Sequence, residues 1–285
     1  MKNKFYYFAI AILLILFAYF SYQILVEIKP LRVVFLDVGQ GDSILIQKGT
    51  KQILIDGGPS GKTELAKLGK YLPYFDREIE LVIATHPDKD HIGGLIEAAR
   101  SYKIGKVLIT AAEKDTNTFE EWKDVLSYNR IETLEAARGT EVKFDGADIK
   151  ILHPQSNVNP SVGEANDKSV VARLDYGDDS FLFTGDIESP AEKEILEGGE
   201  NIDVDVLKIA HHGSKFSSSE EFLDAVSPET AVISVGANNS YGHPTEAVLN
   251  ALKARNTNIL RTDEAGDIEY KCKVKSSKCK VAVQN

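Results

Sequence analysis

The sequence contains little cysteine, no low-complexity tract and no excess of positive charge. Its 285 residues include 9 prolines and 2 cysteines. No interior stretch has the composition of a flexible linker, so residues 30–285 are expected to form one domain. The formal net charge is −10, whereas proteins that grip long nucleic-acid duplexes usually present a basic surface. Tight binding of a long duplex is therefore not expected, although bound metal ions could supply positive charge locally.

Both cysteines, Cys272 and Cys279, lie near the C-terminus. They stand between two runs of alternating residues, a pattern typical of a β-hairpin. A loop at Lys275-Ser276 would place the two side chains opposite each other, where they could form a disulfide of the kind found in oxidising compartments. Two free thiols on a terminal ribbon are equally compatible with the sequence.

An uncharged apolar run extends from Phe5 to Val26. As a helix it would measure about 33 Å, enough to cross the hydrocarbon core of a bilayer. Tyrosines lie toward both of its ends and lysines precede it, as in membrane anchors. The run lacks the small-residue cleavage site of a secretory signal. The sequence therefore predicts that residues 1–29 are an uncleaved anchor with a transmembrane helix at about 5–26. The protein would then be a single-pass protein of the cell membrane with its remaining domain outside.

Apolar runs rich in β-branched residues alternate with segments of helical spacing along the rest of the chain. Strands are expected at Val33–Leu36, Ser43–Gln47, Gln52–Ile55, Leu81–Thr85, Lys106–Thr110, Ile149–Leu152, Val170–Leu174, Phe181–Phe183, Val204–Ile209, Ala231–Val235 and Asn258–Arg261. Helices are expected at Thr63–Leu72, Gly94–Ser101, Thr118–Tyr128, Pro190–Glu197, Ser218–Val226 and Thr245–Ala254. Because the early strands are connected as hairpins, we expect two mixed sheets face to face with helices outside, not one doubly wound sheet.

The densest group of potential metal ligands lies in a short turn after the apolar run Leu81–Thr85. This turn contains His86, Asp88, Asp90 and His91. One ion rarely takes four ligands from so short a loop, because the backbone cannot wrap around it. Two ions about 3.5–4 Å apart, each with about two of these ligands, fit better. A polar surface turn is the alternative interpretation, but these residue types are those expected of metal ligands.

Five further motifs lie along the chain, namely Leu36–Ser43, Leu54–Gly58, Phe183–Asp186, His211–Ser214 and Tyr241–Pro244. Together with the ligand-rich turn they resemble the metallo-β-lactamase superfamily. Its signature His-x-His-x-Asp-His is matched here with Asp88 in place of the second histidine. This variant resembles the hydrolase domain of ComEC-type competence proteins, which are DNA-uptake channels, over about residues 31–270. The sequence shows no counterpart of their polytopic channel or of their oligonucleotide-binding-type domain, so the enzyme class is expected to transfer better than the biological role.

The resemblance implies an αββα sandwich with metal-bearing loops along one edge. It implies that Asp186 bridges two ions and that one residue of the pair His211 and His212 binds the second ion. We favour His212 and keep both. It also places His243 at the rim, where it could bind a phosphoryl oxygen, protonate a leaving group or ligate a metal. The predicted ligands are His86, Asp88, Asp90, His91, Asp186, His211 and His212.

Other polar residues of the motifs are expected around this site. Asp56 is expected to brace a ligand histidine by a hydrogen bond. Asn166 stands where many superfamily members have a histidine, and we expect it to be structural or to contact the substrate. The full set of candidates for binding substrate or supporting the ligands is Gln40, Asp42, Asp56, Asn166, Ser169 and Ser214.

Two further expectations concern cofactors. Ser60-Gly61-Lys62-Thr63 ends like a P-loop, but Asp56 stands where that motif requires glycine, so binding of a nucleoside triphosphate is not expected. The ligand set is rich in oxygen, which moves the preference from Zn²⁺ toward Mn²⁺ and leaves either divalent ion a candidate.

These expectations lead to a metal-dependent hydrolase with two ions, and most directly to a phosphodiesterase that acts on DNA at the cell surface. The ions would activate a bridging hydroxide, Asp90 would hold the proton, and His243 would assist the leaving oxygen. One alternative substrate is a phosphocholine or teichoic-acid decoration of the cell wall. A non-catalytic metal-binding scaffold of a surface complex is the alternative of another class, which an intact ligand set does not favour.

Overall fold

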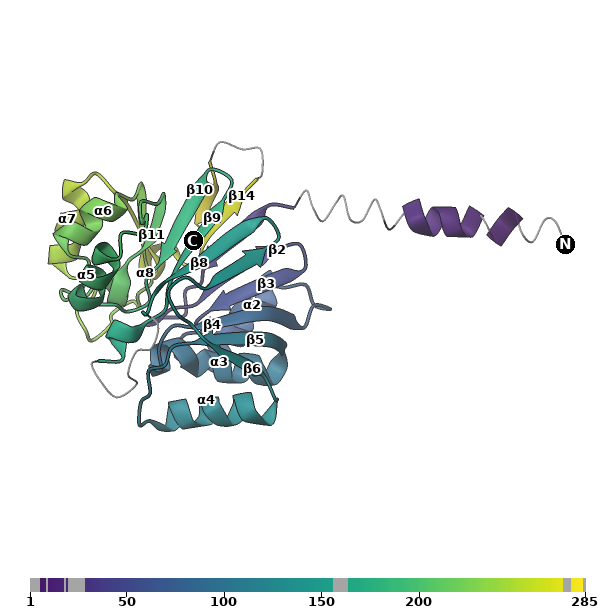
Figure 1. Ribbon diagram of the computed structural model, residues 1–285, viewed down its shortest axis with the longest axis horizontal. Helices are drawn as coiled ribbons and strands as arrows, with labels where there is room; N and C mark the ends of the chain where they lie inside the picture. The colour runs from purple at the N-terminus through teal and green to yellow at the C-terminus, as the bar shows by residue number, and fades with distance from the viewer. Residues whose placement is uncertain are drawn as a thin grey trace.

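The computed structural model describes residues 6–8, 10–17, 19, 29–155, 164–273 and 278–283. Within these ranges two mixed β-sheets face each other and helices cover both outer faces (Figure 1). The αββα sandwich predicted from the sequence is therefore confirmed.

The first sheet has the strand order β15-β14-β1-β2-β3-β4-β5-β6. Its strands are β1 (Leu31–Phe35), β2 (Ile44–Lys48), β3 (Lys51–Ile55), β4 (Glu78–Ala84), β5 (Lys103–Ile109), β6 (Glu132–Glu135), β14 (Ile268–Cys272) and β15 (Lys280–Val283). Strands β1 to β3 are antiparallel neighbours, whereas β3 to β6 are parallel. The parallel strands are connected through α2 (Gly61–Tyr71), α3 (Lys89–Ser101) and α4 (Asn117–Tyr128).

The second sheet has the strand order β13-β12-β11-β10-β9-β8-β7. Its strands are β7 (Glu141–Phe144), β8 (Ala147–His153), β9 (Val171–Tyr176), β10 (Asp179–Phe183), β11 (Val206–Lys208), β12 (Thr230–Ile233) and β13 (Asn258–Arg261). Strands β10 to β13 are parallel. The helical segments of this half are η1 (Asn166–Lys168), α5 (Ser189–Glu197), η2 (Ala210–Gly213), α6 (Glu220–Val226), α7 (Glu246–Ala254) and α8 (Thr262–Ala265).

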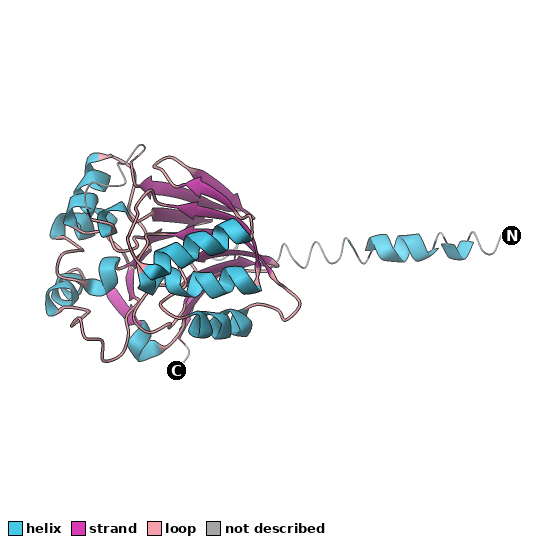
Figure 2. Cartoon of the chain, turned by 90° about the horizontal axis from the view of Figure 1, so that it is seen from below, coloured by secondary structure: helices cyan, strands magenta, loops and turns pink. Residues whose placement is uncertain are grey.

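Alternation of side chains along each strand builds three apolar layers. On β1, Val33 and Phe35 point into the layer between the sheets, whereas Val34 packs beneath the helices of the first sheet. The Phe35 ring meets Phe183 of the second sheet at a centroid distance of 6.1 Å. Figure 2 shows the helices over the outer faces of the strands. Because both faces of the central strands are covered, these strands read as nearly continuous apolar runs in the sequence.

Glycines allow α3 to lie directly against the loop that follows β3. A Cβ atom on Gly94 would lie 1.8 Å from the carbonyl oxygen of Gly57. Because no side chain intervenes, Gly94 N–H donates to the Gly58 carbonyl at 2.8 Å, and Gly57 N–H donates to the His91 carbonyl at 2.7 Å. This close backbone contact brings the first turn of α3 to the end of β3, where Asp56 follows.

Several elements differ from the sequence-based expectation. β6 and β7 were not predicted, because each has only four residues, half of them exposed and charged, and neither gives an apolar run. Cys272 and Cys279 form a disulfide, the first of the two possibilities that the sequence left open. The proposed hairpin loop at Lys275-Ser276 lies outside the described residues.

The predicted membrane anchor is corrected by the structure. Of the expected span, residues 6–8, 10–17 and 19 are described and helical, and the others lie outside the described residues. No helix among the described residues is both long enough and apolar enough to span a bilayer. The prediction of a single-pass membrane protein with an external domain is wrong by this finding, because it rested on the apolarity of the run alone and no described helix combines that apolarity with the length that a span requires.

Glu64 on α2 generates a test of the fold. Its side chain is fully buried, and burial raises its pKa to about 8 from 4.5. Between these values the folded state keeps a proton that the unfolded chain has released, so stability falls as pH rises through this window. Glu64→Gln replaces the carboxyl group by an amide, which does not titrate. The unfolding free energy of this variant, relative to wild type, should rise between pH 5 and 8 by up to about 5 kcal/mol.

Urea unfolding at a series of pH values measures this difference. Glu197→Gln, which alters an exposed residue of α5, is the matched control and should follow wild type. A difference between Glu64→Gln and wild type that does not change with pH would contradict the account of a protonated, buried Glu64.

Candidate metal centre

The candidate site lies at one edge of the sandwich, where the carboxyl ends of parallel strands meet. Asp56 and Thr85 directly follow β3 and β4 in the first sheet. In the second sheet Asp186 follows β10, and His211 and His212 follow β11. Because the strands of each group are parallel, these residues lie at the same edge, as ligand sites in parallel sheets commonly do.

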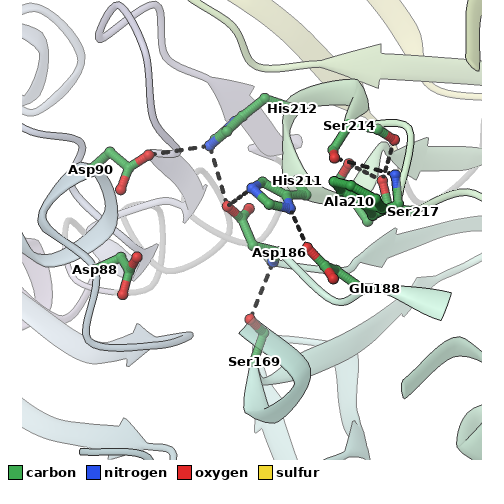
Figure 3. A network of polar contacts seen from close by, with 12 residues as sticks. Asp88, Asp90, Ser169, Asp186, Glu188, Ala210, His211, His212, Ser214 and Ser217 are labelled. Carbon is green, nitrogen blue, oxygen red and sulfur yellow. Dashed lines mark hydrogen bonds and ion pairs between the residues drawn. The ribbon is translucent and has the colours of Figure 1, made fainter. Parts of the chain in front are cut away.

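Four imidazoles surround one oxygen of Asp186. Asp186 Oδ2 lies 3.2 Å from His91 Nε2 and 3.4 Å from His212 Nε2. The Nε2 atoms of His211 and His86 lie 3.9 Å and 4.0 Å from the same oxygen. Figure 3 shows Asp186 between His212 and His211. The sequence motifs that contain these residues are far apart along the chain, and the fold brings their side chains to one point.

The same four histidines are held in similar ways through the other ring nitrogen. Each Nδ1 lies within hydrogen-bond distance of an oxygen atom, which fixes the orientation of the ring and leaves Nε2 facing the centre. The contacts are His91 with Asp56 Oδ2 at 2.8 Å, His212 with the Ser234 carbonyl at 2.8 Å, His86 with Thr85 Oγ1 at 3.0 Å, and His211 with Glu188 Oε1 at 3.1 Å.

Unsatisfied polar atoms at the centre indicate what the site can hold. The buried Nε2 atoms of His86, His91 and His212 make no hydrogen bond of good geometry, and neither does Asp186 Oδ1. Such atoms are rare in folded proteins and need an explanation. The ligand atoms of Asp90, His91, Asp186 and His212 lie within 4.8 Å of one another. Imidazole nitrogens and carboxylate oxygens are ligands for Zn²⁺ and Mn²⁺, so these four residues, the four-ligand cluster, fit a divalent metal ion.

Three side chains at the site are positioned by residues with left-handed backbone conformations. Asp56 has φ 56°, His211 has φ 48° and His212 has φ 54°. A non-glycine residue in this region costs about 1–3 kcal/mol, and such strain concentrates at functional sites. The two consecutive left-handed residues turn His212 into the buried cluster, whereas the His211 side chain stays 23% exposed. The geometry thus favours His212 over His211 as the ligand of the pair, and that assignment remains a prediction.

A buried ammonium group neutralises the acidic interior of the site. Lys208 is fully buried and contacts the Asp42 carboxylate. Its Nζ lies 3.6 Å from Asp186 Oδ1 and donates to the Gly185 carbonyl at 2.9 Å. Burial alone would lower the pKa of Lys208, but Asp42 and Asp186 raise it above the ordinary value. Sequence reasoning did not single out Lys208, although a charged residue inside the apolar run Val204–Ile209 is a signal of a buried ion pair.

The ionisation of the four-ligand cluster follows from this arrangement. Burial would raise the pKa of Asp186, but His212, His91 and Lys208 hold it well below its usual range. Burial would likewise raise the pKa of Asp90, but the neighbouring His212 ring, whose Nε2 lies 3.4 Å from Asp90 Oδ2, lowers it instead. Burial would lower the pKa of His91 and of His212, but Asp186 raises both. Without a metal ion, protons on these two rings balance the carboxylates, and a bound cation would take over that role.

Asp88 lies apart from the four-ligand cluster. Its carboxylate forms an ion pair with Lys114, whose Nζ lies 2.6 Å from each of the two oxygens. Figure 3 shows no interaction between Asp88 and Asp186. The predicted role of Asp88 as a ligand therefore requires the ion pair with Lys114 to open.

His243, for which the sequence predicts a place at the rim, lies beside His211. Its ring centroid is 5.6 Å from that of His211 and 5.9 Å from that of Tyr241. Its Nδ1 is buried and has no hydrogen-bond partner among the described residues. Burial, followed by the charges of His211 and His212, lowers the pKa of His243. Asn239 holds the loop by accepting from His243 N–H at 3.1 Å.

The remaining predicted residues support the loops around the site. Ser169 Oγ accepts from the Asp186 backbone N–H at 3.2 Å and thereby positions the central carboxylate. Gln40 joins two loops, because its Oε1 accepts from Gly236 N–H at 3.2 Å. Asn166 and Ser214 make contacts within single turns: the Asn166 carbonyl accepts from Ser169 N–H at 2.9 Å, and the Ser214 carbonyl accepts from the Ser217 hydroxyl at 3.0 Å. Ser60, from the P-loop-like stretch, caps α2 by accepting from Thr63 N–H at 3.4 Å.

Lys208 provides a test of the charge balance. Lys208→Met should lower the unfolding free energy of the metal-free protein by about 3–5 kcal/mol, because it leaves Asp42 and Asp186 buried without a counter-charge. Urea unfolding in the presence of a chelator measures the loss. Lys193→Met, at an exposed position of α5, is the control and should cost less than about 1 kcal/mol. Equal stability of the two variants would contradict the assigned role of Lys208.

Comparison with known proteins identifies relatives of this chain. ComE operon protein 3 of Bacillus subtilis (strain 168) is 32% identical over 257 residues, which cover 84% of this chain and 32% of that protein. Competence protein ComA of Neisseria gonorrhoeae is 32% identical over 235 residues, which cover 82% of this chain and 31% of that protein. The chain thus spans about a third of the length of the curated relatives it matches. The predicted likeness to competence proteins is confirmed.

A solved structure and a family model agree with this result. The metallo-beta-lactamase fold protein YhfI from Bacillus subtilis superposes with a TM-score of 0.56 over 90% of this chain and 100% of that chain. Its sequence identity is 13%, so the likeness concerns the fold alone. The model of the metallo-beta-lactamase superfamily matches residues 36–237, a range that includes the whole four-ligand cluster. This chain therefore belongs to the metallo-beta-lactamase superfamily.

Proposed function

We propose that this protein is a metal-dependent phosphodiesterase that cleaves DNA. The observation that carries the proposal is the convergence of four histidine Nε2 atoms on Asp186 Oδ2 at the edge of a superfamily hydrolase fold. The choice of DNA rests on the relatives, which are named ComE operon protein 3, competence protein ComA and, in Haemophilus influenzae, recombination protein 2.

The four-ligand cluster would hold one divalent ion. A second ion would be held by His86 and Asp186, together with Asp88 once Lys114 releases it. Carboxylates supply much of this ligand set, which favours Mn²⁺, with Zn²⁺ as the other candidate. When bound, such ions neutralise charge on a phosphoryl group and lower the pKa of water.

The residues of the chain orient and complete this site. Asp56 and Ser234 accept from the Nδ1 atoms of His91 and His212, so each Nε2 faces the centre. Asp90 belongs to the four-ligand cluster, so we assign it to metal binding, and its proton-holding role stays a prediction from the sequence. The pKa of His243 is lowered, which favours its neutral form, and a neutral imidazole can donate one hydrogen bond to an oxygen of the substrate or leaving group.

The acidic chain shapes the expected mode of DNA binding. With a net charge of −10, few phosphates should be gripped, so binding should depend only weakly on salt concentration. A flexible single strand reaches a site at the edge of a sandwich more easily than a stiff duplex does. We therefore propose single strands and strand ends as the preferred substrates.

Asp186→Asn tests the metal-dependent function. The full chain, freed of metal by a chelator, should gain activity on labelled single-stranded DNA and on bis(p-nitrophenyl) phosphate when Mn²⁺ is added. The variant should lose bound metal and at least about 100-fold in kcat/KM, because an interaction worth several kcal/mol in the transition state is removed. Asp203→Asn, at an exposed position, is the isosteric control and should retain both metal and activity.

Three results would contradict the proposal. Hydrolysis that survives complete removal of metal would exclude the assigned site. Full metal content and activity in Asp186→Asn would exclude Asp186 as its centre. Release of phosphocholine from wall polymers without degradation of either form of DNA would replace DNA by the alternative substrate.

A further inference from the structure

A cavity of about 310 Å³ lies beside the metal centre, between the first sheet and helices α3 and α4. Its walls are mainly apolar, and they come from β4, α3, β5 and α4. The residues that form these walls include Ala84, Ile92, Ile109, Phe119, Trp122 and Leu126. A pocket of this size and character falls within the range that binds small organic groups.

The cavity and the metal centre share a wall. His86 lines the cavity, and its Nε2 lies 4.0 Å from Asp186 Oδ2. The loop after β5 also lines the cavity, through residues 110–113, and its next residue is Lys114, which holds Asp88. Only the imidazole ring of His86 would therefore separate a group in the cavity from a phosphoryl group bound at the metal centre. This arrangement suits the part of a substrate that is attached to the reacting group.

The chemistry of the walls limits what this group can be. Phe119 offers aromatic surface, and Trp122, only 2% exposed, closes the inner wall. Lys123, which lies over the Phe119 ring, also lines the cavity, and Glu113 and Glu135 stand at its exposed rim. The ammonium group of Lys123 is paired with Glu120, so the two rim carboxylates still oppose the entry of a second phosphate, and they can accept hydrogen bonds from amino groups. A cavity of about 150 Å³ holds one benzene ring. The volume here is about twice that, which fits a fused two-ring heterocycle.

We propose that this cavity binds one unstacked nucleobase of the strand that is cut. The proposal rests on the proposed function and deepens it, because it assigns the group next to the scissile phosphate. A base must leave its stack to enter such a pocket, at a cost that is least in a single strand. Stacking on aromatic side chains repays this cost without strong dependence on sequence. The pocket thus gives a physical reason for preferring single strands.

Trp122 allows a direct test, because it is the only tryptophan of the chain and lines the cavity. Adenosine, which has no phosphate, is added to the metal-free full chain, and tryptophan fluorescence is recorded. We expect a saturable change. Ala111→Phe fills the cavity from its partly exposed wall and should weaken adenosine binding by at least about tenfold. Phe119→Ala removes one aromatic wall and should also weaken it.

Ala254→Phe makes the same substitution at an exposed position of α7, over the other sheet, and should bind adenosine as wild type does. Circular dichroism tests whether each variant is folded. If Ala111→Phe does not fold, adenosine binding by Phe119→Ala is the test of the proposal. Absence of saturable binding in wild type, or equal binding by wild type and both cavity variants, would overturn the proposal. A saturable change with choline and none with adenosine would also overturn it.

This titration separates the pocket from the proposed function, because it needs neither metal nor hydrolysis. Metal-dependent cleavage of DNA without adenosine binding would overturn the nucleobase pocket alone. Adenosine binding without cleavage of DNA would support the pocket and count against the phosphodiesterase.

Discussion

The site depends on the buried carboxylate of Asp56. It accepts hydrogen bonds from the Thr85 backbone N–H at 2.8 Å and from the Thr85 hydroxyl at 2.6 Å, and it lies 2.8 Å from His91 Nδ1. These contacts tie the ends of β3 and β4 to the first turn of α3. The Thr85 hydroxyl, whose proton goes to Asp56, in turn accepts from His86 Nδ1 at 3.0 Å. One carboxylate thus fixes the orientation of two histidines from the ligand-rich turn, as supporting residues do in metal sites.

The second sheet completes the site with charge as well as with ligands. It contributes Asp186, His212 and the buried Lys208, and the fold places Asp42 of the first sheet against Lys208. Four carboxylates, of Asp42, Asp56, Asp90 and Asp186, therefore lie near one ammonium group and two histidines whose pKa values are raised. Such a concentration of negative charge persists only when cations balance it. A divalent ion fits this interior better than protons on imidazole rings do, because it also satisfies the unpartnered Nε2 atoms.

Much of the fold and of the site can be predicted from the sequence because the informative residues stand at strand ends. Apolar runs marked the central strands, and the turn from His86 to His91 marked the site. The roles of Lys208 and Glu188 could not be assigned from the sequence. Packing between segments distant in sequence brings Lys208 to Asp42, and a left-handed turn brings His211 to Glu188. The sequence likewise did not separate His211 from His212 as the ligand, because the same left-handed turn decides which of the two side chains is buried. Strand β6 is exposed throughout, and the apolar face of β7 consists of only Val142 and Phe144, too short a pattern to assign from sequence. The membrane anchor was predicted from the apolarity of the N-terminal run alone, and no described helix is long and apolar enough to span a bilayer.

The central claim is that the four-ligand cluster binds a divalent metal ion. Anomalous diffraction from crystals of the full chain grown with Mn²⁺ tests it most directly. The account predicts a strong anomalous peak within about 2.0–2.4 Å of His91 Nε2, His212 Nε2 and Asp186 Oδ2, a usual range for such bonds. It also predicts that this peak disappears when the crystals are soaked in chelator. A map with no peak between these atoms, in crystals where the same three side chains are well ordered, would contradict the account.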